Sequence, residues 1–248
     1  MNKPLLIWQN GIFPDSELCA AEKYFDIIRL DFLDTLKISS FIEQDKPYSF
    51  RGSLAFAYKL GFRQEEFNCS KWVPHFYDDM LSQDFYWQIA EKVTIPIGGH
   101  LFVKSDSCKK IIAGQVFNES KWQEELNYLR QRNSEKILCF CATPEVIGKE
   151  IRCIFVGMEL IDMTVYMDNG EILDTPYNIL PGMGIPELAK KIRANQYFSP
   201  EDNLTIDIGK KLFQGYRLIE INQLETSGWY SANPSKIYEK LAAQLNYE

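Results

Sequence analysis

The sequence has very few histidines: only His75 and His100 occur in 248 residues. Histidine is the usual general base beside a serine or cysteine nucleophile, and it is a common zinc ligand. The chain accordingly shows no Ser-His or Cys-His signature and no spacing typical of a zinc site. Long hydrophobic runs are also missing, because no stretch approaches the ~20 apolar residues of a membrane span, and the apolar run after Met1 is too short for a secretory signal. We therefore expect a cytoplasmic protein that does not span a membrane.

Clustered positive charge is absent as well. The 27 Lys and Arg residues are outnumbered by 34 Asp and Glu residues, which gives a net charge of −7. Nucleic-acid binding depends on basic groups that neutralise phosphates, so we expect no nucleic-acid partner. Of the six cysteines, only Cys139 and Cys141 lie close together, on one face of an expected strand. This pattern favours buried free thiols in a reducing compartment.

The first part of the chain alternates between strand and helix patterns. Residues 4–9 and 25–30 are typical of strands, and the short helix expected between them begins at Ser16 as its cap, which predicts a small parallel sheet. A second helix is expected to start after Arg51 and Ser53. Its N-terminus could receive an anion, and a capped helix with a surface arginine explains the pattern equally well.

The remaining chain is predicted to form a second, larger unit. The aromatic-rich segment 62–100 lacks clear periodicity and is expected to pack between two lobes, with a domain boundary near residue 80. The composition, 46% hydrophobic and 25% charged, is that of a globular protein long enough for two lobes. The elements expected beyond this segment are strands at 101–104, 111–117, 136–141, 150–156 and 159–167, and helices after 118, at 185–193 and at 235–245.

Three oxygen-bearing side chains near the C-terminus are candidate metal ligands. Glu220 and Asn222 stand two residues apart in an apolar strand, so strand alternation points both to the same face. Asp207 lies on the preceding apolar run. Carboxylate and amide oxygens suit Mg²⁺, which often shares its ligands with substrate phosphates. An isolated Glu-x-Asn would be better explained as the solvated face of an edge strand, and Asp207 is what favours a magnesium site.

Two further positions could bind phosphate. Lys104 ends an apolar strand before the polar loop 105–110, where a lysine can hold a phosphate pair as a point charge. The loop lacks the glycine density of a P-loop, and a flexible surface loop is the alternative. Glu150 and Arg152 alternate on one strand, so Arg152 could neutralise a transferring phosphate while Glu150 orients it. A cross-strand ion pair on a solvated face is the alternative.

The order of these elements resembles the ATP-grasp superfamily from about Gly99 to the C-terminus. Within that superfamily the chain looks most like a compact clade named for two arginines and a lysine, known largely from bacteria and their phages. The motifs that carry the resemblance are Phe102-Val103-Lys104, Gly114-Gln115-Val116-Phe117, Glu150-Ile151-Arg152 with Tyr166, and Glu220-Ile221-Asn222 followed by Ser227-Gly228-Trp229-Tyr230.

The resemblance implies an α+β ATP-grasp fold, in which two α+β lobes hold ATP between them. This fold would occupy residues 81–248, and a small α/β pre-ATP-grasp domain would occupy residues 1–80. The implied reaction is ATP- and Mg²⁺-dependent ligation of a carboxylate to an amine through an acyl-phosphate, on a small-molecule or peptide substrate. The alternative is an ATP-binding module without ligase turnover that acts through a protein partner. The oligomeric state is left open.

The resemblance also implies how the chain would hold the nucleotide. Lys104 would contact the α and β phosphates, and the loop that includes Lys110 would cover them. Residues 139–145 would form the hinge beside adenine, and either Glu145 or Glu150 would reach the ribose. The hinge residues expected to contact the cofactor are Cys141 and Ala142.

The remaining implied roles concern metal, phosphate transfer and substrate. Asp207, Glu220 and Asn222 would hold one or two Mg²⁺ ions, with Arg152 on the transferring phosphate. Ser227 and Gly228 would face the acceptor. Independently of the resemblance, Arg51 is a possible anchor for a substrate carboxylate.

Overall fold

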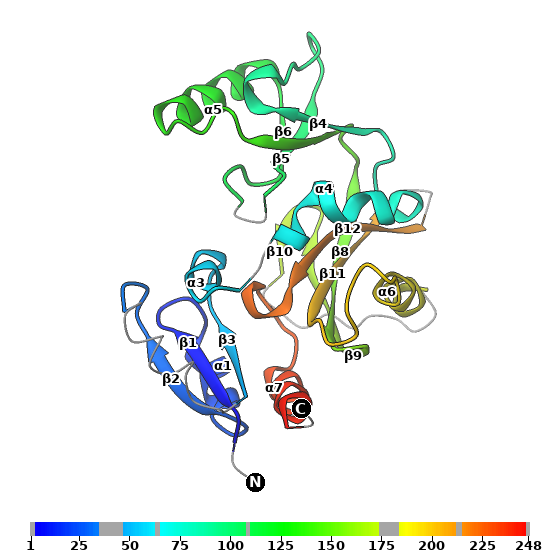
Figure 1. Ribbon diagram of the computed structural model, residues 1–248. Coiled ribbons are helices and arrows are strands. Elements are labelled where there is room, and N and C mark those ends of the chain that lie inside the picture. Colours follow the sequence, from blue (N-terminus) through cyan, green and yellow to red (C-terminus); the bar gives the residue numbers. More distant parts are fainter. Residues whose placement is uncertain are drawn as a thin grey trace.

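Three β-sheets follow one another along the molecule (Figure 1). The computed structural model describes residues 3–34, 47–62, 65–107, 110–173, 184–211 and 215–246. A three-stranded sheet lies at the N-terminal end, a five-stranded sheet lies in the middle, and a four-stranded sheet lies at the opposite end.

The N-terminal sheet is parallel, with strand order β2-β1-β3. Its helix α1 begins after Pro14 and has no side-chain cap, so the expected cap at Ser16 is wrong, because Ser16 lies inside the first turn. Ser53 does cap the next helix, since its hydroxyl accepts a hydrogen bond from the Phe56 amide at 3.2 Å. The predicted β-α-β start is confirmed. Its elements are β1 (Leu5–Gln9), α1 (Asp15–Ala21), β2 (Asp26–Leu30), β3 (Tyr48–Arg51) and α3 (Leu54–Lys59).

The aromatic segment between the sheets packs against the five-stranded sheet. Trp72 and Phe76 share one buried cluster with Ile151 and Ile206, so the expected packing between lobes is confirmed. A strand in this segment was not predicted: aromatic residues occupy both faces of β4 and hide its alternation. The elements are η2 (Glu65–Phe67), α4 (Cys69–Trp72), η3 (Val73–His75), η4 (Tyr77–Asp79), β4 (Phe85–Ile89) and η5 (Ala90–Lys92).

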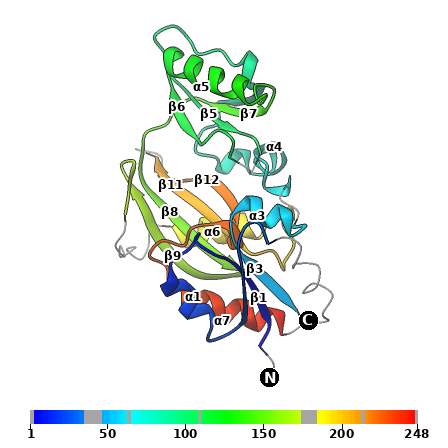
Figure 2. The same cartoon turned by 90° about the vertical axis from the view of Figure 1, so that its left-hand side faces the viewer.

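The four-stranded sheet has the order β4-β7-β5-β6 and is covered on one face by helix α5 (Figure 2). The predicted cap of α5 is confirmed, because the Asn118 side chain accepts from the Lys121 amide at 2.9 Å. Cys139 and Cys141 are buried beneath α5, and burial raises their thiol pKa values to about 12 and about 11. Both thiols are therefore protonated packing groups. The elements are β5 (Leu101–Ser105), β6 (Gln115–Phe117), α5 (Glu119–Gln131) and β7 (Leu138–Ala142).

The five-stranded sheet is antiparallel, with the order β10-β9-β8-β11-β12. Helix α6 packs on its buried cluster through Ile185, Ala189 and Ile192. The expected hairpin at Gly157 and the expected terminal helix are confirmed. The elements are β8 (Ile147–Val156), β9 (Glu159–Asp168), β10 (Glu171–Ile172), α6 (Ile185–Arg193), β11 (Leu204–Lys211), β12 (Gly215–Gln223), η6 (Leu224–Thr226) and α7 (Pro234–Leu245).

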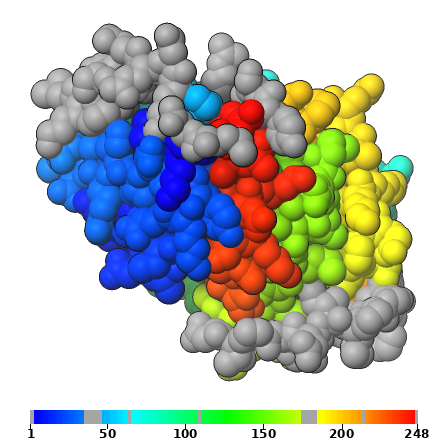
Figure 3. Space-filling model, turned by 90° about the horizontal axis from the view of Figure 1, so that it is seen from below, coloured from blue at the N-terminus to red at the C-terminus, as the bar shows by residue number. Residues whose placement is uncertain are grey.

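The C-terminal helix returns to the N-terminal sheet. Figure 3 shows α7, in red, between the blue N-terminal segments and the green β8–β9 region. Leu18 of α1 and Leu6 of β1 share a buried cluster with Ile237 and Leu241 of α7. The two ends of the chain are thus joined by one core. Within the described ranges, no helix is long and apolar enough to cross a membrane.

Arg51 lies at this junction and not at a ligand site. Its side chain is 1% exposed, and its Nε donates to the Glu17 carboxylate at 2.6 Å. Its Nη1 donates to the backbone carbonyls of Leu224, Glu225 and Ser227 at 3.3, 2.9 and 2.7 Å. The expectation that Arg51 anchors a substrate carboxylate is therefore wrong, because a carboxylate of the same chain already neutralises it.

Glu225, beside this junction, should make stability depend on pH. Burial raises the pKa of Glu225 to about 7, against opposing contributions from Asn203 and Arg51, and its Oε2 has no partner in the described structure. Because the pKa is higher in the folded state, the protonated form of Glu225 stabilises the fold relative to the unfolded chain. This contribution is complete below pH ~4.5 and is lost as the pH rises through about 7. The difference amounts to about 3 kcal/mol. Urea unfolding of Glu225→Gln should show a shallower fall over this range than wild type, and parallel curves would contradict the prediction.

Candidate functional site

A cleft of about 340 Å³ lies between the four-stranded and the five-stranded sheets. Its walls come from strands far apart in sequence, because β5 carries Lys104, β8 carries Glu150 and β12 carries Glu220 and Asn222. The polar residues that line it are Lys104, Ser105, Asp106, Ser107, Lys110, Glu150, Tyr166, Glu220 and Asn222. The structure thus brings together most of the residues predicted to bind phosphate and metal.

Lys104 and Glu220 meet directly across the cleft. Lys104 Nζ lies 3.2 Å from Glu220 Oε1, and the two side chains are 12% and 22% exposed. Although burial opposes the charged lysine, contacts with Cys69 and Glu220 raise the pKa of Lys104 above its ordinary value. The ammonium is therefore permanently charged and held at the junction of the two sheets.

Glu220 is held in its ionised form. Lys110 approaches it at 3.5 Å, and the Asn222 amide donates to Glu220 Oε2 at 3.0 Å. Burial alone would raise the pKa of Glu220, but Lys104 and Lys110 outweigh burial and hold the pKa far below its ordinary value. Lys109 of the predicted phosphate loop lies outside the described residues.

Arg152 and Asp207 form a buried ion pair next to Glu220. Arg152 Nε and Nη2 donate to the two Asp207 oxygens at 2.8 and 2.6 Å, and Nη1 donates to the Gly228 carbonyl at 2.7 Å. Asp207 is 1% exposed. The register places Arg152 opposite Asp207, and Asp207 opposite Glu220. Strand pairing therefore aligns one guanidinium and two carboxylates across three strands.

The oxygen donors of β11 and β12 suit a divalent cation. Asp207, Glu220 and Asn222 share one face of paired strands, and such carboxylate and amide oxygens are the ligands that Mg²⁺ prefers. In the described part of the chain, no three His, Cys, Asp or Glu side chains cluster as ligands, so the site would depend on the Asn222 amide oxygen. A metal would also share Asp207 with Arg152. Metal binding by these three residues remains a prediction.

A second group of polar and aromatic side chains surrounds Glu150. The Tyr166 hydroxyl donates to Glu150 Oε2 at 2.5 Å. This hydrogen bond lowers the pKa of Glu150, but burial outweighs it and raises the pKa above its ordinary value. The Tyr166 ring stacks on Tyr230 at 4.9 Å, and the Arg152 guanidinium lies 5.0 Å from the Tyr166 ring. The Arg152 guanidinium is therefore held by two aromatic rings as well as by Asp207.

Comparison with known protein families identifies the family of the chain. A family model for an ATP-grasp domain, family 3 of the clade named for two arginines and a lysine, matches residues 43–241, which is most of the chain. The chain belongs to this ATP-grasp family. No curated protein sequence matches it.

Solved structures of ATP-grasp ligases share the fold. D-alanine–D-alanine ligase from Bacillus anthracis superposes with a TM-score of 0.63 at 10% identity, over 100% of this chain and 97% of that chain. D-cycloserine synthetase DcsG gives a TM-score of 0.63 at 10% identity, over 97% and 99%. N5-carboxyaminoimidazole synthetase from Staphylococcus aureus gives 0.57 at 14%, over 90% and 72%. Identities this low establish the fold alone, and the predicted α+β ATP-grasp fold is confirmed.

The predicted hinge, residues 139–145, turns few side chains toward the cleft. Cys141 and Ala142 are buried in the cores on the two faces of β7, so only their backbone groups could meet a nucleotide. Glu145 forms an ion pair with Lys211 at 2.8 Å. Glu150, and not Glu145, is among the cleft-lining residues. The adenine and ribose roles of all four residues stay predictions.

The loop after β12 turns its polar groups inward. The Ser227 hydroxyl donates to the Gln223 carbonyl at 2.7 Å, and Ser227 is 6% exposed. The expectation that the Ser227 side chain faces an acceptor is therefore wrong, because backbone and Thr205 bind it. The Gly228 carbonyl accepts a hydrogen bond from Arg152 and so helps to position that side chain. That Gly228 also faces the acceptor substrate stays a prediction.

The sequence interpretation missed one wall of the cleft. Phe67 and Cys69 of the connecting segment line it together with Phe102. Gly114 is needed beside them, because a Cβ there would lie 2.8 Å from the Phe102 ring. Phe67 and Cys69 stand in irregular sequence, so no periodic signal could have identified them.

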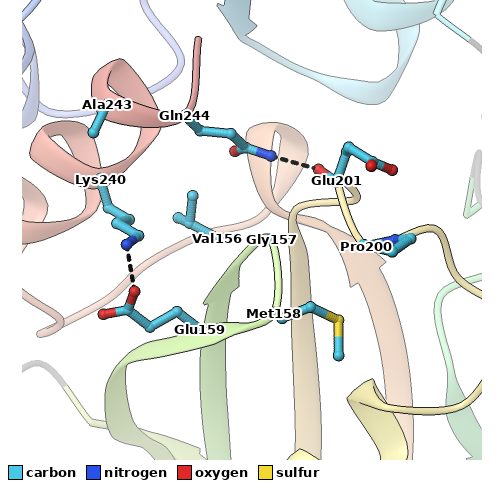
Figure 4. A pocket seen from close by; sticks show the side chains of 9 residues that line it. All are labelled: Val156, Gly157, Met158, Glu159, Pro200, Glu201, Lys240, Ala243 and Gln244. Carbon is cyan, nitrogen blue, oxygen red and sulfur yellow. Dashed lines mark hydrogen bonds and ion pairs between the residues drawn. The ribbon is translucent and has the colours of Figure 1, made fainter. Parts of the chain in front are cut away.

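A second hollow, of about 440 Å³, lies between α7 and the β8–β9 turn. Figure 4 shows its few polar contacts: Lys240 pairs with Glu159, and the Gln244 amide donates to the Glu201 carbonyl at 2.8 Å. Met158 and Ala243 contribute apolar surface. The hollow offers one ion pair and no converging set of charges, so its size alone does not make it the site.

Proposed function

We propose that the chain is an ATP- and Mg²⁺-dependent carboxylate–amine ligase. The observation that carries this proposal is the meeting of Lys104 from one sheet with Glu220 and Asn222 from the other in a single cleft. A phosphate-binding cation and oxygen ligands for a metal thus stand on opposite walls of one cavity. Membership of the ATP-grasp family and the ligases of like fold support the same interpretation.

ATP would lie between the two sheets with its phosphates toward Lys104 and Lys110. In the proposed reaction, a substrate carboxylate would take the γ-phosphoryl group of ATP and release ADP. An amine would then displace phosphate from the acyl-phosphate and lose a proton to solvent as the amide forms. Mg²⁺, held by Asp207, Glu220 and Asn222, would offset charge on the phosphate oxygens. The protein's contribution is mainly to position charged partners, and no nucleophilic side chain is required.

Arg152 is the residue we assign to the transferring phosphate. Arg152 is aligned with Asp207 and Glu220 across three paired strands. Burial alone would lower the pKa of its guanidinium, but Asp207 outweighs burial and raises the pKa, so Arg152 stays cationic. A fixed cation in a buried site stabilises developing negative charge more than it would in water. Arg152 is not itself among the cleft-lining residues, but its neighbour Tyr166 and Glu150, which Tyr166 binds, are.

Release of ADP and phosphate tests the ligase proposal. We expect both products when the protein is incubated with ATP, Mg²⁺ and a panel of amino acids and small peptides. Asn222→Ala should lower this rate by at least about a hundredfold, because it removes a metal ligand from a charge-stabilising site. Asn246→Ala, at the exposed end of α7, is the control and should retain the wild-type rate. Undiminished turnover by Asn222→Ala would exclude the metal assignment.

An ATP-binding module that acts through a protein partner is the second candidate. The observation that favours it is that neither Arg152 nor Asp207 is among the residues that line the cleft. The two side chains bind each other, and Arg152 also binds the Gly228 carbonyl, so Arg152 would have to turn toward the cleft to reach a phosphate there. Nucleotide binding by calorimetry without product release across the whole panel would favour the module over the ligase.

The remaining assignments extend from the ligase proposal. We propose a small-molecule or peptide substrate, a cytoplasmic location, no nucleic-acid partner, and a division into residues 1–80, as a pre-ATP-grasp domain, and 81–248. Because α4 packs on the five-stranded sheet, a division between α3 and η2 is the alternative to the one at residue 80.

A further inference from the structure

Asp106, in the loop that follows Lys104, is bound to the segment that joins the N-terminal sheet to the ATP-grasp lobes. Its Oδ1 accepts the Ser70 amide at 2.5 Å, and its Oδ2 accepts the Ser70 hydroxyl at 2.7 Å. The Asp106 carbonyl accepts the Cys69 amide at 3.1 Å. Three hydrogen bonds therefore tie the end of β5 to the start of α4.

These contacts cross from one lobe to the other. Cys69 and Trp72 of α4 belong to the buried cluster that contains Ile151 of β8 and Ile206 of β11. The Asn68 side chain makes no cap hydrogen bond to α4, so Asp106 provides the side-chain acceptor for the first turn of the helix. The four-stranded sheet is thereby fastened to the lobe that carries Glu220.

Asp106 places a carboxylate where the phosphates of a nucleotide are proposed to bind. It lines the cleft two residues after Lys104, where a carboxylate would repel a nucleotide's phosphates. It is 6% exposed, and both of its oxygens are directed to Ser70 by hydrogen bonds. A buried carboxylate bonded in this way contributes through the position of the two segments that it joins, because both of its oxygens already accept hydrogen bonds from Ser70.

The strand end that carries Asp106 is also fixed. The Ser105 amide donates to the Ile112 carbonyl at 3.2 Å, and the Asp106 amide donates to the Leu138 carbonyl at 2.8 Å. Cys69 of α4, in the connecting segment, contacts Lys104, and Glu220 of β12 contacts the same lysine. A shift of α4 relative to β5 would therefore move the Lys104 ammonium relative to Glu220.

We propose that Ser70 and Asp106 form a latch that sets the position of Lys104 for the phosphates of a nucleotide. Both are positioning residues, since they act through β5 and α4 and not by contact with the nucleotide. The latch rests on the proposed function in that a nucleotide must occupy the cleft.

Binding of a non-hydrolysable ATP analogue with Mg²⁺, measured by calorimetry, tests the latch. Asp106→Ala removes two hydrogen bonds to a charged acceptor and should weaken binding about ten- to hundredfold. Ser70→Ala should weaken it about three- to tenfold, and Ser70→Thr, which keeps the hydroxyl, should bind like wild type. The double variant should bind no more weakly than Asp106→Ala, because the two residues act through one contact.

Hydrogen exchange in the nucleotide-free protein examines the latch without relying on turnover. Asp106→Ala should accelerate exchange of the Cys69 and Ser70 amides, while Ser120→Ala, an exposed serine on α5 of the same lobe, should leave exchange and binding unchanged. Wild type that binds nucleotide, with latch variants that bind equally well, would overturn the latch alone. Wild type that fails to bind nucleotide would overturn the proposed function and this role of the latch together.

Discussion

Arg152→Met is expected to lower the free energy of unfolding by about 3–5 kcal/mol, because it leaves a buried carboxylate without its partner. Asp207 is 1% exposed and receives two hydrogen bonds from Arg152. A divalent cation that binds Asp207 would replace the lost positive charge. Mg²⁺ should therefore stabilise the variant more than it stabilises wild type, and urea unfolding with and without Mg²⁺ measures this difference. Product release should fall by about 10²–10³-fold.

The double variant Arg152→Met/Asp207→Asn is the matched control. It removes the uncompensated carboxylate together with its partner, so it should recover much of the lost stability and should lose the extra response to Mg²⁺. An Arg152→Met protein as stable as wild type would contradict the buried ion pair. An equal response to Mg²⁺ in both proteins would argue against Asp207 as a metal ligand.

The candidate site was largely predictable because its residues stand on regular strands. Strand alternation places Glu220 and Asn222 on one face, and the structure confirms that both line the cleft. The register of β11 between β8 and β12 then aligns Asp207 with Arg152 and Glu220. Sequence alone could not show that Arg152 pairs with Asp207, since two remote strands must be adjacent for the two charges to meet.

The errors lie where contacts come from distant segments. Arg51 was taken as a possible carboxylate anchor, with a surface arginine as the alternative, because it stands just before an expected helix start. Its partner, Glu17, belongs to α1, and its other acceptors belong to the turn after β12. The hydroxyl of Ser227 is likewise hydrogen-bonded to the Thr205 hydroxyl and the Gln223 carbonyl. Local pattern cannot anticipate a side chain whose partners lie in other elements of the fold.

The same reasoning explains the missed wall and the missed strand. Phe67, Cys69 and Ser70 join the cleft through irregular backbone, which carries no period that a sequence can display. Strand β4 lacks the alternation of a half-buried strand because Phe85 and Trp87 pack on Phe140 while Tyr86, on the other face, is also aromatic. Aromatic density was correctly taken as packing between lobes, and the strand within it could be recognised only from its pairing with β7.

Arg51→Met is expected to destabilise the protein by about 3–5 kcal/mol while leaving the candidate site intact. The change removes the cationic partner of the buried Glu17 carboxylate and one donor from each of three backbone carbonyls. The carbonyls of Leu224 and Glu225 keep other donors. It also removes a guanidinium that lies 3.5 Å from the centre of the Phe13 ring. Urea unfolding should therefore show a lower midpoint. The apparent KM values and the turnover of the folded fraction should match wild type, because Arg51 lies outside the cleft.

Lys59→Met provides the matched comparison. Lys59 also lies over an aromatic ring, at 3.8 Å from Phe32, but it is exposed and pairs with no buried carboxylate among the residues that the structure describes. Its replacement should change stability by no more than about 0.5 kcal/mol. In Arg51→Met/Glu17→Gln the uncompensated charge is gone, so part of the stability should return. A raised KM for the carboxylate substrate in Arg51→Met, with unchanged stability, would instead reinstate Arg51 as a substrate anchor and contradict its structural role between α1 and the turn after β12.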